Sequence, residues 1–271
     1  MANILNHAKN LVYKVYFQDT YEKKMAHSIV VIIPARYAST RFPGKPLIDI
    51  DGLTLLQRTY NRVQLSPLVT RIIIATDDQR IFDHAQSFGG ECVMTSPDCL
   101  TGTDRVAEVV VQQPELQEKT MLINVQCDEP CFDPTIIDKI ASTLSSSDDI
   151  ATAVTPLINE KDLVNPSIVK CVKRLDGRAL YFSRQPIPRV QKQAHFSYFR
   201  HIGIYAFWPK FLLKFMTLPA TPLQLTEDLE MLKALEHGFS IATVEVESCA
   251  PEVNTREDIS KVIAWNQSFC S

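Results

Sequence analysis

The chain has 271 residues, of which 45% are hydrophobic and 22% are charged, and its formal net charge is -3. This length is sufficient for one large α/β domain with a substantial hydrophobic core. The weakly acidic balance argues against a nucleic-acid-binding protein, although it allows a local basic pocket for a small anion. No apolar run approaches the roughly 20 residues that span a bilayer, so we expect no stable membrane insertion.

The cysteines and the first residues indicate the compartment. Seven cysteines are present, without a CxxC pair or a zinc-type spacing to histidine. We therefore expect reduced thiols and a cytoplasmic protein, because disulfides persist chiefly in oxidising compartments. Residues 1–27 contain four lysines and lack the apolar centre of a secretory signal. We interpret them as an N-terminal arm, either a disordered extension or a wrongly assigned start with Met25 as the true initiator.

From Ser28 onward, apolar runs alternate with helical patterns. The apolar runs predict buried strands at 28–34, 71–76, 91–94 and 120–126. Helical spacing and terminal residues predict helices at 53–63, 79–88, 103–111 and 135–144. Strands that alternate with helices imply a mostly parallel sheet covered on both faces, which is the three-layer arrangement of a Rossmann-like α/β fold.

After Ile150 the pattern changes to closely spaced strands. They are expected at 151–156, 168–174, 179–184 and 200–208. The turn at Asp176 and Gly177 favours an antiparallel extension within about 165–208, where a dimer interface or a second lobe could form. A helix at 227–237, a strand at 241–246 and a helix at 256–266 are expected to complete a single domain over residues 28–271.

The loop at 34–46 directly follows the first expected strand and carries much positive charge. Arg36, Arg41 and Lys45 place three cations within ten residues, with no acidic residue among them. Ligands of open α/β sheets bind at the carboxyl ends of strands, where backbone amides and basic side chains suit a polyphosphate. The loop is not a Walker A motif, because proline follows its Gly-Lys pair, and no GxGxxG follows any strand. A triphosphate site is therefore favoured over an ATPase or dehydrogenase site, with a solvated basic turn as the alternative.

Six segments in a fixed order identify a family. They are PARYASTRFPGKPL at 34–47, ATDD at 75–78, TGTDR at 101–105, NVQCDEP at 124–130, ALYFSRQPIP at 179–188 and HIGIYAF at 201–207. Together they resemble the CMP-Kdo synthetases, the 3-deoxy-manno-octulosonate cytidylyltransferases, whose fold is that of the nucleotidyltransferases. The resemblance runs from about Ser28 to the C-terminal helix. CMP-sialic acid synthetases share the general fold, but the last two segments are more similar to the Kdo family.

The resemblance implies an activity and a set of site residues. The activity is transfer of CMP from CTP to the sugar acid 3-deoxy-D-manno-octulosonate (Kdo), with Mg²⁺, for lipopolysaccharide assembly. A homodimer is also implied, and two-fold dimers are the commonest closed assembly. The implied residues are, for catalysis, Arg36, Arg41, Lys45 and Asp128; for the nucleotide, Ala35, Arg36, Thr101, Gly102, Thr103 and Arg105; for the sugar, Arg184, His201, Tyr205, Glu227 and Glu230; and for the metal, Asp128 and Asn254.

Several of these residues also have a purely structural interpretation. Asp128 and Thr103 could each cap a turn or a helix. His201 could be a satisfied strand histidine. Glu227 and Glu230, three residues apart and thus on one face of the expected helix, could form a solvated surface.

Three residues depart from the family pattern. Cys127 replaces the usual Gly before the metal-binding Asp, and Met231 replaces the usual Gln after the helical Glu. Asn254 replaces an Asp that helps to bind a second Mg²⁺, and an amide oxygen brings no negative charge to that ion. The departures keep two alternatives open: a cytidylyltransferase for another acidic sugar, such as a sialic or amino-modified ulosonic acid, and a nucleotide-binding pseudoenzyme.

Overall fold

The computed structural model describes residues 27–38, 42–118, 120–190, 196–247 and 250–269. Residues 1–26 of the expected arm and the predicted catalytic residue Arg41 lie outside these ranges. The predictions for them therefore stay predictions.

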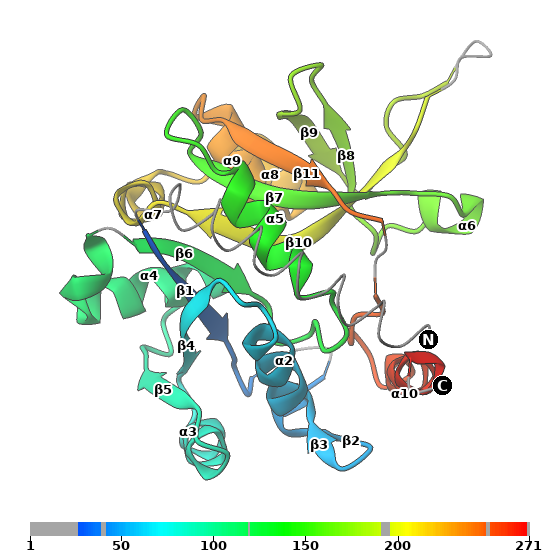
Figure 1. The fold of residues 1–271 in the computed structure, drawn as a ribbon. Helices are drawn as coiled ribbons and strands as arrows, with labels where there is room; N and C mark the ends of the chain where they lie inside the picture. The colour runs from blue at the N-terminus through cyan, green and yellow to red at the C-terminus, as the bar shows by residue number, and fades with distance from the viewer. Residues whose placement is uncertain (1–26, 39–41, 119, 191–195, 248–249, 270–271) are drawn as a thin grey trace, which may run out of the picture.

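The centre of the fold is a nine-stranded sheet in the order β11-β7-β10-β6-β1-β4-β5, with β8 and β9 branching from β10. Figure 1 shows this sheet running from β5 near the bottom of the view to β11 near the top. Neighbouring strands along this order are parallel, except that β10 is antiparallel to both β6 and β7. The mostly parallel sheet expected from the sequence is thus confirmed. The strands are β1 (Ser28–Pro34), β4 (Val69–Thr76), β5 (Glu91–Met94), β6 (Thr120–Val125), β7 (Ile150–Pro156), β8 (Lys170–Lys173), β9 (Ala179–Ser183), β10 (Phe199–Phe207) and β11 (Ile241–Glu245).

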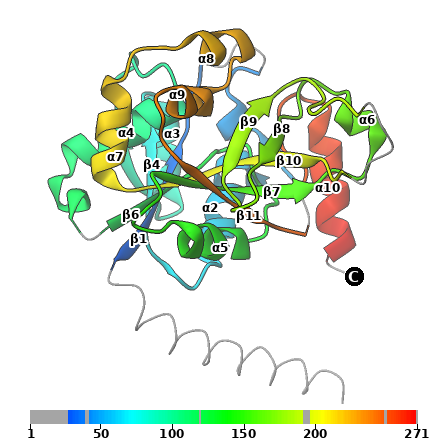
Figure 2. The ribbon, with the colours of Figure 1, turned by 90° about the horizontal axis from the view of Figure 1, so that it is seen from above.

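Helices cover both faces of the sheet. Successive side chains of a strand point to opposite faces, so neighbouring residues of one strand belong to different cores. Val31 of β1 belongs to a core with helices α2, α3, α5 and α10, whereas Ile32 belongs to a core with α4, α7 and α9. Figure 2 shows α4 and α7 side by side. The three expected layers are therefore present. The helices are α2 (Leu55–Gln64), α3 (Gln79–Ser87), α4 (Gly102–Gln112), α5 (Thr135–Thr143), α7 (Pro209–Thr217), α9 (Glu230–Glu236) and α10 (Asp258–Phe269).

The antiparallel strands expected within 165–208 are also present. β8 and β9 form a hairpin whose turn contains Gly177, with a positive φ of 86° that favours glycine. The start of β10 continues this antiparallel pairing by lying against β8. The smaller elements are β2 (Asp49–Ile50), β3 (Leu53–Thr54), α6 (Glu160–Leu163) and the 3₁₀ helices η1 (Lys45–Leu47) and η2 (Pro114–Gln117).

The helix expected at 227–237 is present as α9, but it begins at Glu230 and not at Glu227. Glu227 instead ends a separate helix, α8 (Pro222–Glu227), and Asp228 between the two helices has a left-handed backbone with φ of 53°. Aspartate tolerates this conformation better than most residues, so the chain turns without a glycine. Glu227 ends one helix and Glu230 begins the next, which means that they do not share a helical face.

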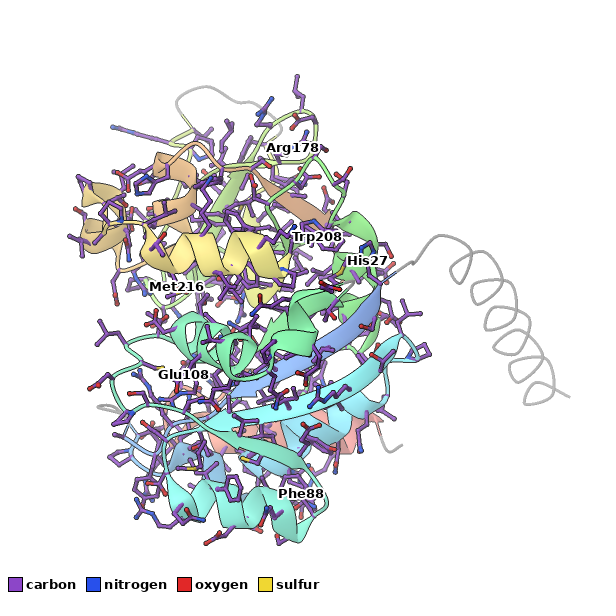
Figure 3. The ribbon with its side chains drawn as sticks, turned by 90° about the vertical axis from the view of Figure 1, so that its left-hand side faces the viewer. His27, Phe88, Glu108, Arg178, Trp208 and Met216 are labelled. Carbon is purple, nitrogen blue, oxygen red and sulfur yellow. The ribbon has the colours of Figure 1, made fainter. Side chains whose placement is uncertain are left out.

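The residue directly before β1, His27, packs against the start of α7. The rings of His27 and Trp208 lie edge to face, with their centroids 4.9 Å apart, and Figure 3 shows the two side chains next to each other. Trp208 immediately precedes α7, a helix that the sequence analysis did not predict.

Among the helices that the structure describes, none is long and apolar enough to cross a membrane.

Candidate active site

The site lies where the order of strands reverses. The chain runs from β1 to β4 and β5 on one side, and then crosses to β6 on the other side of β1. Such a reversal leaves a crevice outside the carboxyl ends of the strands, where α/β sheets bind ligands. The loop after β1, the start of α4 and the residues after β6 all reach this crevice.

Two residues predicted for catalysis meet there. The ammonium nitrogen Nζ of Lys45 lies 2.6 Å from carboxylate oxygen Oδ2 of Asp128, and the side chains are 15% and 28% exposed. The same ammonium donates to the carbonyl of Val253 at 3.0 Å. The N–H of Val253 in turn donates to the carbonyl of Asp128 at 3.0 Å. The loop after β1, the turn after β6 and the segment before α10 are therefore joined at one point.

The loop after β1 folds back on itself around a glycine. The N–H of Gly44 donates to the carbonyl of Tyr37 at 2.9 Å, and Gly44 has a φ of 71°. A Cβ at this position would lie 3.1 Å from the Tyr37 ring, so both backbone shape and space favour glycine. At the start of the loop, Ala35 is buried, whereas Arg36 is exposed, and its one hydrogen bond to a described residue is to the carbonyl of Leu100, at 3.4 Å. The Arg36 guanidinium is consequently accessible to an incoming anion.

The predicted nucleotide turn forms the start of α4. Thr101 and Asp104 make a capping box, which satisfies backbone N–H groups at the helix start. A Cβ on Gly102 would lie 3.0 Å from the Gln126 side chain, so glycine allows α4 to approach the end of β6. The hydroxyls of Thr101 and Thr103 donate to the carboxylate of Glu230 at 3.0 and 2.6 Å. The turn predicted for the nucleotide thus touches a residue predicted for the sugar.

Arg105, in the first turn of α4, is buried against neighbouring polar residues. Its side chain is 2% exposed, and its guanidinium lies 3.0 Å from the Asp77 carboxylate and also donates to Thr95. Removing one partner of such a buried pair leaves an uncompensated charge, so the pair fixes the geometry of the turn. The predicted contact between Arg105 and the nucleotide stays a prediction.

Next to the Lys45–Asp128 pair lies a cavity of about 220 Å³. It is lined by carboxyl groups, one guanidinium and aromatic rings from the end of β6, the start of β10, the start of α9 and the segment before α10. The start of β10 reaches it because Ile204 pairs with Val125, the last residue of β6, so the preceding residues of β10 extend past that strand. The lining includes Gln126, Asp128, Glu129, Phe182, Arg200, His201, Tyr205, Glu230, Met231 and Glu252.

Glu129 is an unusual member of this lining. Its side chain is 4% exposed, and among the described residues it has no hydrogen-bond or ion-pair partner. Burial, followed by the nearby carboxylate of Glu252, raises its pKa well above the usual value. Burial also raises the pKa of Glu230, although the bonds from Thr103 and Thr101 act in the opposite direction. The cavity therefore contains carboxyl groups that hydroxyl groups of a ligand could contact.

His201 and Tyr205 lie next to each other in the cavity wall, with ring centroids 5.3 Å apart. The His201 ring also packs at 4.8 Å from that of Phe182, and its Nε2 lies 3.1 Å from the hydroxyl of Thr152. Burial, and then the charge of Arg200, lowers the pKa of His201 to about 3. The imidazole is consequently neutral at physiological pH. Burial raises the pKa of Tyr205, so its hydroxyl keeps its proton.

Arg184 and Glu227 form a separate cluster outside this lining. The carboxylate of Glu227 accepts from the Ser183 hydroxyl at 2.6 Å and from the Arg184 N–H at 3.0 Å. The Arg184 guanidinium donates to backbone carbonyls, those of Glu227 at 2.9 Å and Pro166 at 3.1 Å among them. The structure therefore brings together His201, Tyr205, Glu230 and Asp128, but places Arg184 and Glu227 beside them.

The guanidinium that lines the cavity is that of Arg200, which forms an ion pair with Glu252. Sequence reasoning missed both residues. Strand alternation places Arg200 and His201 on opposite faces, but both line the cavity because they lie at the start of β10, before its pairing with β6 begins. The sequence carried no local signal for Arg200, because its place in the cavity depends on how far β10 extends past β6.

The residues that depart from the family pattern are accommodated. Cys127 is buried in the core on the α2 side, and the only described non-glycine residues with positive φ are Asp51 and Asp228, so no glycine is required there. Met231 is 2% exposed and gives the cavity an apolar wall. The amide nitrogen of Asn254 donates to Glu252 at 3.1 Å.

Within the described part of the chain, no three His, Cys, Asp or Glu side chains gather closely enough to hold a metal ion.

Comparisons with known proteins agree on one family. A family model described as cytidylyltransferase matches residues 30–246. The chain is 49% identical over 247 residues to a 3-deoxy-manno-octulosonate cytidylyltransferase of Protochlamydia amoebophila, which covers 89% of this chain and 95% of the relative. The corresponding enzyme of Syntrophotalea carbinolica is 44% identical over 248 residues, with 88% and 98% covered.

Solved structures give the same result. A CMP:2-keto-3-deoxy-manno-octonic acid synthetase complexed with CTP is 36% identical, with a TM-score of 0.84, and the match covers 89% of this chain and 99% of that one. A cytidylyltransferase from Leptospira borgpetersenii has a TM-score of 0.60 at 15% identity, which shows a shared fold alone.

Proposed function

The chain belongs to the 3-deoxy-manno-octulosonate cytidylyltransferases, and from this membership we propose that it transfers CMP from CTP to Kdo and releases pyrophosphate. The observation that carries the proposal is the Lys45–Asp128 pair beside the cavity that contains Arg200, His201 and Tyr205. The ammonium of Lys45, which we propose binds phosphate, thus lies next to a cavity that contains a guanidinium and that we propose binds the sugar.

In the proposed reaction, the anomeric 2-hydroxyl of Kdo attacks the α-phosphorus of CTP in line. A bond forms between the sugar oxygen and phosphorus, and the bond from phosphorus to the oxygen that bridges to the β-phosphate breaks. The hydroxyl releases its proton to water as the new bond forms, and no covalent enzyme intermediate is required. Catalysis rests on positioning and on neutralising charge. Lys45 and the exposed Arg36 supply positive charge to the phosphates, together with Arg41 in the same loop.

The donor chemistry of the site fits Mg²⁺. This ion prefers oxygen ligands, and nucleotide enzymes hold it with one or two carboxylates plus phosphate oxygens and water. Asp128 faces the cavity and offers such a carboxylate, and the amide oxygen of Asn254 is the candidate second ligand. A dedicated cage of three acidic side chains is not needed for this mode of binding. Bound Mg²⁺ would offset negative charge on the reacting phosphates.

On the sugar side, the cavity offers a partner for each kind of group in Kdo. The Arg200 guanidinium is placed to exchange its ion pair with Glu252 for one with the sugar carboxylate. Arg184 could also bind the sugar carboxylate only if its guanidinium gave up its hydrogen bonds to the backbone carbonyls of Glu227 and Pro166. The carboxyls of Glu129 and Glu230, the Tyr205 hydroxyl and the His201 ring are suited to sugar hydroxyls.

The test is pyrophosphate release by the purified protein. We expect release from CTP only when Kdo and Mg²⁺ are both present, and none after EDTA is added. A panel of sialic and amino-modified ulosonic acids tests for a different sugar specificity. Binding of CTP without pyrophosphate release for any sugar acid would identify a nucleotide-binding pseudoenzyme and contradict the proposal.

We further propose that the protein works as a cytoplasmic homodimer and that its product serves lipopolysaccharide assembly. CTP is a nucleotide of the cytoplasm, which supports this location. The β8–β9 hairpin presents two exposed leucines, Leu175 and Leu180, which suit a protein contact. Light scattering coupled to gel filtration should give about twice the 30.6 kDa of one chain. Retention of the monomer mass would contradict the dimer.

A further inference from the structure

A buried threonine lies directly against the cavity histidine. Thr152, on β7, is fully buried, and its hydroxyl oxygen lies 3.0 Å from the carbonyl oxygen of Ile202 and 2.8 Å from that of Ile204. It also lies 3.1 Å from Nε2 of His201. The pairing of β7 with β10 shifts register between Ile202 and Tyr205, which turns both carbonyls toward this hydroxyl.

The placement of hydrogens at this point follows from the partners. A hydroxyl has one hydrogen, and a carbonyl oxygen can only accept. If the Thr152 hydrogen pointed to His201, both carbonyl oxygens would face an oxygen lone pair within 3.0 Å. The hydrogen is therefore shared by the two carbonyls, and the hydroxyl oxygen accepts a hydrogen from Nε2 of His201. Since the imidazole is neutral, its Nδ1 then has no hydrogen and can only accept.

Nδ1 of His201 is open to the cavity. His201 lines the cavity, and no hydrogen bond to its Nδ1 is made by any described residue. In the part of the chain that the structure describes, the only fully buried side-chain nitrogen or oxygen atom without a partner is the hydroxyl of Thr221. The free Nδ1 is consequently not sealed in the core.

We propose that Thr152 is a positioning residue that holds His201 in the tautomer with hydrogen on Nε2, so that Nδ1 accepts a hydrogen bond from a hydroxyl group of the bound sugar. The second half of this proposal rests on the proposed function, whereas the first half concerns the protein without substrate. A histidine fixed in this way selects for a hydroxyl at one position of the sugar, because a ligand that lacks a donor there leaves Nδ1 unpaired.

The tautomer is tested by nitrogen-15 NMR of the ligand-free protein labelled at histidine, with His201→Gln to identify the signals. We expect hydrogen on Nε2 and a bare Nδ1 in the unmodified protein and in Thr152→Ser, and a mixture of tautomers in Thr152→Val. Thr243→Val is the matched control, because Thr243 is a strand threonine that donates to the Gly177 carbonyl at 2.6 Å outside the cavity. Hydrogen on Nδ1 in the unmodified protein would overturn the proposal even if Thr152→Val failed to fold.

The role toward the sugar is tested by kinetics. We expect Thr152→Val to raise the KM for Kdo about tenfold, which corresponds to about 1.4 kcal/mol, while the KM for CTP stays within about twofold. Thr152→Ser should restore the value, and Thr243→Val should not change it. An unchanged KM for Kdo in a folded Thr152→Val with mixed tautomers would refute this role. If the unmodified protein did not turn over Kdo at all, the proposed function would fail, while the NMR result would still decide the tautomer.

Discussion

The hydroxyl of Thr103 donates to the carboxylate of Glu230 at 2.6 Å, which joins the start of α4 to the start of α9. The two helices are far apart in the sequence, and the family resemblance implies that one residue contacts the nucleotide and the other the sugar. Hydrogen bonds to charged groups contribute about 1.5–3 kcal/mol to stability. This bond therefore fixes the distance between the two parts of the site before either substrate binds.

We expect Thr103→Val to lower the free energy of unfolding by about 1.5–3 kcal/mol, because it leaves a buried carboxylate oxygen without a donor. The measurement is urea unfolding at pH 8, with Glu230→Gln and the double variant to complete a cycle. The effects of the single variants should not add. Thr226→Val removes an exposed hydroxyl that bonds within α8 and should change stability by less than about 0.5 kcal/mol. Additive effects of Thr103→Val and Glu230→Gln on the free energy of unfolding would show that this hydrogen bond does not stabilise the protein.

Asp128→Asn should lower turnover at least about 100-fold while the protein stays folded. The substitution keeps the shape of the side chain but removes the charge that pairs with Lys45 and that would hold Mg²⁺. Steady-state pyrophosphate release and circular dichroism measure the two effects. Asp98→Asn, at an exposed loop position, is the control and should keep full activity. A folded Asp128→Asn variant with the unmodified rate would place the metal elsewhere.

Asn254→Asp should have opposite effects with and without Mg²⁺. The amide of Asn254 donates to the Glu252 carboxylate at 3.1 Å, so aspartate there sets two like charges side by side. We expect a lower melting temperature in EDTA. With Mg²⁺, the restored charge should lower the concentration needed for half-maximal rate, by about tenfold for each 1.4 kcal/mol of added attraction. Overlapping Mg²⁺ titrations of the two proteins would show that residue 254 is not a metal ligand.

The buried His201 should make the protein less stable in mild acid. Burial lowers its pKa from 6.5 to about 3, so between these values the unfolded state binds a proton that the folded state does not. Stability then falls as pH falls through this window, by at most about 1.4 kcal/mol per pH unit. Between pH 7.5 and pH 5.0, the unmodified protein should lose about 2 kcal/mol more than His201→Gln. Glu129 and Glu230, whose raised pKa values act in the opposite direction, are common to both proteins. Equal losses in urea unfolding would refute the shift.

The sequence predicted most of the sheet and its helices, because buried strands such as 120–126 and amphipathic helices such as α2 have clear periodicities. It also predicted that Lys45 and Asp128 belong to one site. The break at Asp228 was not predictable, since the residue is not glycine and the turn is compatible with a helical pattern on both sides. Arg200 was missed for a different reason. Its place in the cavity depends on how far β10 extends past β6, which is a tertiary pairing that no local pattern encodes.

The direction of β10 also affects how the sugar preference of this protein can change. In most open α/β sheets the ligand is contacted by loops, which tolerate insertions and substitutions well. Here Arg200 and His201 at the start of β10, and Tyr205 further along it, come from a strand that pairs with β7 on one side and with β8 and then β6 on the other. Insertions there would shift the register of the strand and move buried side chains to the wrong face. A new sugar preference would therefore have to arise from single side-chain replacements on a rigid frame, with Met231 at the start of α9 as one position where a polar residue could be introduced.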